Sequence, residues 1–281
     1  MVEHLNCRMC SAQNLFRQER LAELQGILTR VAPEWSQEIS VVEDEEEMEN
    51  GYRIEMSDPA SLFAILTKEA AKTDPYRQRA HENRAKLARA DGKQIPPYDP
   101  EELSDSRVIT DVKQDLMLFL KYDNKPNLLE QNCLGGHCYS RKFEGIRSEV
   151  FLQSLFVELA TRMPFDYGHA ELGTEWADKH AVTDGHYIGI DFQRYLPGLS
   201  WLNFFGPLYC DFIGRKRLLT APGKWVKELA GGVLIALGDS PYEWDSLEYR
   251  ERCAAVEAYL GQEYFFNITD PNRNTRAPGF L

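Results

Sequence analysis

Residues 112–121 read VKQDLMLFLK, and this stretch decides the fold class. Val112, Leu116, Leu118 and Leu120 alternate with neighbours that include Lys113 and Lys121. Successive side chains of a β-strand point to opposite faces, so this spacing gives a strand with one apolar face. Such a face has to be covered by other elements, and we therefore expect a sheet with helices packed against it.

Downstream of this strand, helix-like and strand-like segments follow one another without strict alternation. Apolar residues recur at helical spacing in residues 146–163, 208–219 and 242–262. Strand-like patterns occupy residues 166–173, 186–192, 201–205 and 233–237. The mixture predicts an α+β fold with a mixed or antiparallel sheet covered by helices on one face, and it disfavours a doubly wound fold.

Upstream of the strand, the chain is mainly helical. Residues 11–31 predict a helix, a second helix begins at Ser57, and residues 39–56 predict a hairpin between them. Residues 74–107 form a basic, polar helical stretch followed by prolines, which is typical of a linker or a solvent-bridging helix. We expect an amino-terminal helical region over 1–107, with the hairpin and a charged linker, and an α+β domain over 108–281, together forming one compact unit.

The composition limits the classes of partner. The 281 residues include 44 acidic and 32 basic residues, which gives a formal net charge of −12. Such a charge repels phosphate backbones and attracts basic proteins, so direct nucleic-acid binding is disfavoured. The first ten residues resemble no secretory signal, and no run approaches the roughly 18 apolar residues of a membrane span. We expect a cytoplasmic protein without a membrane partner.

The six cysteines are too sparse for a disulfide-stapled domain, and we expect them to be mostly reduced. Cys7 and Cys10 form a CxxC pair, and Cys133 and Cys138 form a Cx4C pair, so four zinc ligands are available on paper. The long separation of the pairs, and an amino terminus expected to fray, argue against zinc. We expect neither a metal nor a cofactor.

Motifs for catalysis are mostly missing from the sequence. Phosphate-binding glycine loops, a GxSxG nucleophile turn and an HExxH metal helix do not occur. The most enzyme-like cluster is His180, Asp184 and His186, with His169 nearby, which could bind a metal or form an acid–base pair. Thr183 and Gly185 within the cluster indicate a turn, so we favour a capping or surface role. A metal-dependent hydrolase is kept as the alternative function.

An acidic run lies within the predicted hairpin, and it consists of Glu43, Asp44, Glu45, Glu46, Glu47 and Glu49. Like charges this close repel one another, so the run has to be solvated or neutralised by a partner. It is either a solubilising loop or a partner-binding site. As a binding site it would mimic a phosphate backbone or steer a basic protein into contact.

Residues 195–209 read YLPGLSWLNFFGPLY and residues 213–222 read IGRKRLLTAP. This passage resembles the core motif of the immunity protein 52 family and of a sister family of type VI secretion immunity proteins. Turn formers, apolar anchors and helix breakers dominate it, so we interpret its residues as mainly architectural. The motif residues are Pro197, Gly198, Trp201, Asn203, Gly206, Pro207, Gly214 and Arg215.

The resemblance implies an antidote that is held in the cytoplasm of a toxin-producing cell. It implies stoichiometric inhibition of a secreted nuclease effector with a restriction-endonuclease-like fold, rather than catalysis. An acidic antidote suits a nuclease whose DNA-binding cleft is basic, because complementary charges accelerate association. A structural adaptor that joins larger partners through the basic segment and the acidic run is a third possibility.

Overall fold

The computed structural model describes residues 4–37, 39–42, 52–54, 58, 61–90, 104–111, 116–123, 132–139, 142–180, 182–183, 186–187 and 191–278. Ten strands form one sheet in which each neighbouring pair is antiparallel. In spatial order they are β13 (Trp225–Leu229), β14 (Gly232–Ala236), β12 (Leu202–Phe205), β9 (Tyr167–Leu172), β1 (Leu5–Cys10), β6 (Cys133–Cys138), β5 (Leu116–Asp123), β4 (Ser104–Asp111), β2 (Ile39–Val42) and β3 (Tyr52–Ile54). The α+β class is confirmed.

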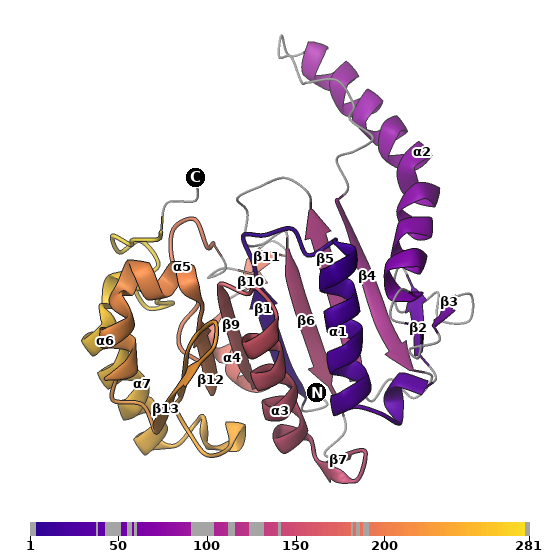
Figure 1. Ribbon diagram of the computed structural model, residues 1–281. Helices are drawn as coiled ribbons and strands as arrows, with labels where there is room; N and C mark the ends of the chain where they lie inside the picture. Colours follow the sequence, from indigo (N-terminus) through magenta and orange to yellow (C-terminus); the bar gives the residue numbers. More distant parts are fainter. Residues whose placement is uncertain are drawn as a thin grey trace.

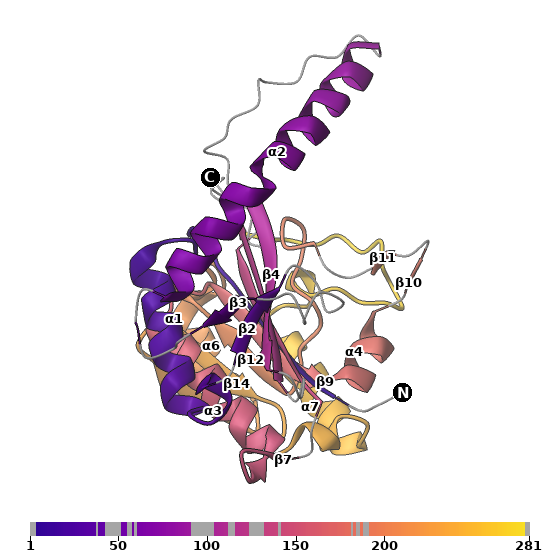
Figure 2. The same ribbon diagram turned by 90° about the vertical axis from the view of Figure 1, so that its right-hand side faces the viewer.

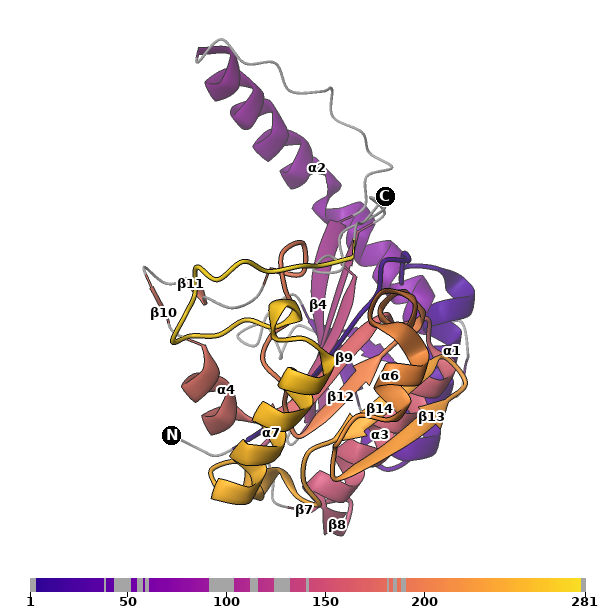
Figure 3. The same ribbon diagram turned by 90° about the vertical axis from the view of Figure 1, so that its left-hand side faces the viewer.

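Helices pack on both sides of this sheet (Figure 1; Figure 3). They are α1 (Gln18–Val31), α2 (Ser61–Ala90), α3 (Ser148–Arg162), α4 (Gly173–Lys179), α5 (Pro207–Tyr209), the π-helix η4 (Cys210–Gly214), α6 (Arg215–Leu219) and α7 (Leu247–Leu260). Short 3₁₀ turns and two small hairpins complete the set: η1 (Trp35–Gln37), η5 (Pro241–Glu243), η6 (Gln262–Tyr264), β7 (Lys142–Phe143) with β8 (Ile146–Arg147), and β10 (Val182–Thr183) with β11 (His186–Tyr187). None of the helices in the described ranges has the length and apolar character that a bilayer span requires.

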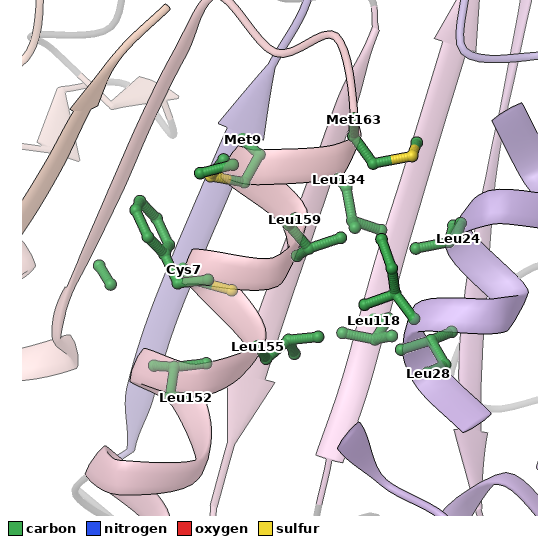
Figure 4. Packing of buried hydrophobic residues seen from close by; sticks show 14 of the residues in the cluster. Cys7, Met9, Leu24, Leu28, Leu118, Leu134, Leu152, Leu155, Leu159 and Met163 are labelled. Atoms are coloured by element: carbon green, nitrogen blue, oxygen red, sulfur yellow. The ribbon is translucent and has the colours of Figure 1, made fainter. Parts of the chain in front are cut away.

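The first face of the sheet is the one covered by α1 and α3. Figure 4 shows leucines of these two helices meeting residues of the central strands, among them Leu118 and Leu134. Leu116, Leu118 and Leu120 of β5 are all at most 1% exposed and belong to this core. The predicted apolar face of the strand is therefore confirmed, although β5 begins at Leu116 and residues 112–115 lie outside the described ranges.

The second face is covered by the segment from α5 to α6 and by α7. Its core holds residues at the alternate strand positions, such as Tyr167, Phe205, Val233 and Ile235. Because β9, β12 and β14 are buried at all their positions, they need cover on both sides. The expectation that helices lie on one face only is wrong for this reason.

The amino-terminal strand lies in the middle of the sheet. β1 pairs with β9 on one side and with β6 on the other, and Met9 and Cys10 have no exposed surface. The expectation of a frayed amino terminus is therefore wrong, because these residues complete the ladder between two strands that come much later in the chain. The two regions expected at 1–107 and 108–281 both contribute strands to this one sheet.

Other predicted elements differ at their boundaries. α1 begins at Gln18 rather than near Ser11, whose hydroxyl donates instead to the carbonyl of Pro164 at 2.6 Å. The second helix and much of the polar stretch are one continuous helix, α2, whose first turns pack by Leu62 and Leu66 while the remainder projects from the body (Figure 2). The predicted hairpin is confirmed as β2 and β3.

Candidate functional site

The acidic run, from Glu43 to Glu49, lies outside the described residues. The strands that flank it in the sequence, β2 and β3, form one end of the sheet. β12, which carries part of the family-like motif, is third from the opposite end of the sheet. The strands next to the predicted partner-binding residues and the motif therefore belong to different parts of the molecule.

The first half of the motif is tied into the core by polar contacts of buried side chains. Asn203 on β12 accepts a hydrogen bond from the backbone N–H of Ser200 at 2.9 Å and donates to the carbonyl of the same residue at 2.6 Å. The indole N–H of Trp201 donates to the carbonyl of Gly238 at 3.2 Å. Both side chains are at most 1% exposed, so they hold the loop before β12 and are inaccessible to a partner.

The second half of the motif shapes the passage from β12 into the helices. A Cβ atom on Gly206 would lie 2.2 Å from the carbonyl oxygen of Phe165, so only glycine fits this close backbone approach. Pro207 opens α5 at a position where a missing N–H costs nothing. Gly214 has φ +102° where η4 gives way to α6, and Arg215 pairs with Glu228 at 3.0 Å on the surface.

A buried polar network lies between this motif and the second face of the sheet. Glu171 of β9 has no exposed surface, and its carboxylate accepts a hydrogen bond from the hydroxyl of Ser200 at 2.7 Å. His169, two residues earlier on the same strand, lies with Nε2 at 3.4 Å from the other carboxylate oxygen. Burial raises the pKa of Glu171 from 4.5 to about 8, against the opposing charge of Lys179. Burial also holds the pKa of His169 well below its ordinary value.

The network continues through α4 to α7. Lys179 Nζ lies 2.5 Å from Glu175 Oε1 and also donates to the carbonyl of Leu199. The hydroxyl of Tyr249 on α7 donates to the same Glu175 oxygen at 2.7 Å. A cation, a carboxylate and a phenol from two helices thus pair with one another. The second carboxylate oxygen of Glu175 is buried without a hydrogen-bond partner among the described residues.

Two of the four residues of the predicted metal cluster fall next to this network. The indole of Trp176 stacks on the rings of His169 and His180, with centroid distances of 5.7 Å and 3.7 Å. Asp184 lies outside the described residues, and of His186 only its place in β11 is described. Within the described ranges, no group of three or more His, Cys, Asp or Glu side chains is placed to hold a metal ion.

The four cysteines considered as zinc ligands do lie on adjacent strands, β1 and β6. Cys7 and Cys138 belong to the core of the first face, whereas Cys10 and Cys133 belong to the core of the second. Their spacings of three and five residues place the members of each pair on opposite faces. The sheet itself therefore separates the two halves of the hypothetical site.

The network contains a hydroxyl, an imidazole and a carboxylate, as a catalytic triad does, but they are not arranged in the spatial order of a triad. In a nucleophilic triad the imidazole lies between the hydroxyl and the carboxylate, whereas here the carboxylate of Glu171 lies between Ser200 and His169. All three residues are at most 3% exposed. Its connections, from the motif through β9 and α4 to α7, are those of a rigid polar core.

No motif in the sequence singles out Glu171, Glu175 or Lys179. The spacing of Glu175 and Lys179 by four residues on a helix was the available signal, since such pairs face each other. Their burial depends on α7, which comes about 70 residues later, as the separation of 74 between Tyr249 and Glu175 shows.

In comparisons with known proteins, no family model and no curated protein matches this chain. Among solved structures, the chain is similar to the Pseudomonas aeruginosa T6SS protein PA0821, with a TM-score of 0.49 and 13% sequence identity, over 92% of this chain and 75% of the other. The resemblance of residues 195–222 to the immunity protein 52 family stays a prediction. We therefore base the functional proposal on the residues of this chain.

Proposed function

We propose that this protein is a cytoplasmic immunity protein that binds and neutralises a cognate nuclease effector of a type VI secretion system, by stoichiometric inhibition rather than by catalysis. The observation that carries the proposal is the passage at residues 195–222, whose order of turn, aromatic anchors, helix breakers and basic exit resembles the motif of such antidotes.

The placement of that passage supports a binding function located elsewhere on the molecule. Trp201 and Asn203 are buried and hydrogen-bonded within the core, so they stabilise the scaffold. A partner would have to bind at other surfaces. The acidic run from Glu43 to Glu49 comes between two strands at one end of the sheet, and it is our candidate for contact with the basic cleft of a nuclease. The net charge of −12 favours the same kind of partner.

Co-expression tests this proposal. The candidate toxin is the protein encoded by the gene next to the one for this chain, and its production alone should arrest growth. Co-production of this protein should restore growth, and the two should co-purify at a fixed molar ratio. In a DNA-cleavage assay, inhibition should be complete once that ratio is reached. Absence of both rescue and co-purification would refute the proposal, and inhibition by far less than one equivalent would indicate an enzyme.

A double variant separates binding from the hydrolase alternative. Asp184→Asn with His186→Gln removes two of the three central residues of the predicted metal cluster while leaving the net charge nearly unchanged. Under the binding proposal this variant neutralises the toxin as the wild type does. Loss of neutralisation in a variant that still binds the toxin would favour metal-dependent hydrolysis.

A further inference from the structure

Two cysteines face each other across the central strands of the sheet. Cys10 ends β1 and Cys133 begins β6, they are direct partners in the antiparallel register, and their sulfur atoms lie 2.7 Å apart. A disulfide bond is about 2.05 Å long, so this pair is already near bonding distance. All six cysteines of the chain are within the described residues, and none is bridged.

The backbone at this pair has the geometry that a disulfide needs. The next register pair is joined by a hydrogen bond from the N–H of Ser11 to the carbonyl of Asn132 at 2.8 Å. Hydrogen-bonded and non-hydrogen-bonded pairs alternate along an antiparallel ladder, so Cys10 and Cys133 form a non-hydrogen-bonded pair. The Cα atoms of such a pair are about 4.5 Å apart, which lies within the roughly 4.4–6.8 Å range of disulfides.

A basic residue adjoins the pair on the same face of the sheet. Arg8, two residues before Cys10, places Nη2 at 3.8 Å from the sulfur of Cys133. Burial opposes ionisation of Cys133, but the hydrogen bond with Cys10 and the charge of Arg8 together lower its pKa below the ordinary value. Burial and the Cys133 sulfur raise the pKa of Cys10. In the folded pair Cys133 is therefore the more readily ionised thiol, and the thiolate is the form that attacks a disulfide.

The other two cysteines on these strands form a natural control. Cys7 is opposite Gly136, and Cys138 is opposite Leu5, so the two are diagonal rather than direct neighbours. Diagonal positions are about 7–8 Å apart, which is beyond the reach of a disulfide without backbone movement. Burial also raises the pKa of Cys7 to about 12, which suppresses its thiolate.

We propose that Cys10 and Cys133 form a disulfide that joins β1 covalently to β6 when the chain meets a low-molecular-weight disulfide such as oxidised glutathione. The thiolate of Cys133 attacks one glutathione sulfur and releases the first glutathione. Cys10 then attacks Cys133 of the mixed disulfide and releases the second. The two thiol protons and two electrons end on two molecules of reduced glutathione. Because the cysteines are 0% and 4% exposed, the reaction takes place during folding or local opening.

The test uses the full-length chain, refolded from denaturant across a series of reduced-to-oxidised glutathione ratios. Non-reducing proteolysis and mass spectrometry should find one intramolecular cross-link, between the peptides that hold Cys10 and Cys133. Titration of thiols in denaturant should fall from six to four. Because the link closes a loop of more than 100 residues, the oxidised protein should melt roughly 5–10 °C higher than the reduced protein.

Substitutions complete the test. Cys10→Ser and Cys133→Ser should each abolish the cross-link, whereas Cys7→Ser and Cys138→Ser should keep it. Recovery of six free thiols at every glutathione ratio would overturn the proposal, as would a link between Cys7 and Cys138 instead. If a variant fails to fold, the cross-link and the thiol titration of the wild type still decide the question. None of these measurements involves the toxin, so they are independent of the proposed function.

Discussion

Asn203 is a fully buried amide, and at the scale of single residues it ties the loop before β12 to the core. Its side chain pairs with both the N–H and the carbonyl of Ser200. Asn203→Ala leaves these two buried groups unpaired, so the free energy of unfolding should fall by about 2–4 kcal/mol. Urea unfolding followed by tryptophan fluorescence measures this. Asn272→Ala, at an exposed position, should change it by less than about 0.5 kcal/mol. Similar losses in both variants would contradict the assigned role.

Glu171 gives a second prediction at this scale, because its raised pKa makes stability depend on pH. Between pH 6.5 and 8 the carboxyl is ionised in the unfolded chain but largely keeps its proton in the folded protein, since burial raises its pKa to about 8. Unfolding then releases a proton, so the free energy of unfolding falls as the pH rises, by up to about 1 kcal/mol per pH unit.

Glu171→Gln should remove this part of the pH dependence. The amide oxygen still accepts the hydrogen bond from Ser200, and the side chain does not ionise. Urea unfolding at several values between pH 6.5 and 8 measures the slope for both proteins. The lowered pKa of His169 adds a slope of opposite sign below pH 6.5 and in the lower part of this range, so the contribution of Glu171 is read from the difference between the two proteins near pH 7.5–8. Parallel curves for wild type and variant would show that Glu171 does not titrate there.

At the scale of elements, the hydroxyl of Tyr249 joins α7 to α4 through Glu175. Tyr249→Phe removes one hydrogen bond to a buried carboxylate, so we expect a loss of about 1–2 kcal/mol in the free energy of unfolding. Tyr259 is the matched control on the same helix, because its hydroxyl meets Thr220 at 2.7 Å at the surface and the residue is 40% exposed. Tyr259→Phe should cost less than about 0.5 kcal/mol. Equal losses in the two variants would mean that the buried hydrogen bond between α7 and α4 stabilises the fold no more than the surface contact of Tyr259 does.

The elements also show how far the sequence predicts the fold. Stretches with a strong local pattern were found correctly, such as the leucines of β5 and the apolar run of β14. β1 (LNCRMC) was missed because the amino terminus was expected to fray, although Leu5, Cys7 and Met9 alternate with Asn6 and Arg8. β6 (CLGGHC) was missed because its two glycines interrupt any alternation. These two strands are defined by pairing with each other and with their neighbours, which is a long-range property that a local pattern does not contain.

The same reason applies to the site. The passage around Trp201 was recognisable because it is contiguous in the sequence. The network of Glu171, Glu175 and Lys179 is assembled from β9, α4 and a helix far downstream, and a carboxylate in an alternating strand normally predicts an exposed face. Burial overrides that expectation because β9 is covered on both faces.

At the scale of the whole molecule, the acidic charge should increase the rate of association with a basic partner. This prediction rests on the proposed function. Neutralising Glu45, Glu46 and Glu47 to Gln should slow association with a basic toxin roughly tenfold at low salt, because local charge steers the encounter. The matched control neutralises three carboxylates on the surface of the carboxy-terminal region, Asp245→Asn, Glu251→Gln and Asp270→Asn, and should slow association less than about twofold.

Stopped-flow association at about 50 and about 300 mM NaCl measures both triple variants. The difference between them should shrink at the higher salt concentration, because screening weakens interactions between exposed charges. If the two variants associate at the same rate at low salt, the run between β2 and β3 contributes only to overall charge.

The central position of β1 has a consequence for synthesis on the ribosome. Cys10 precedes its partner Cys133 by 123 residues, and at roughly 5–20 residues per second that distance takes about 6–25 s to translate. Until then the backbone of β1 has neither of its neighbouring strands to pair with, so this central strand stays unpaired in the nascent chain. β1 gains its second neighbour only after Tyr167–Leu172 has emerged, so this strand is made well before both of its edges can be paired.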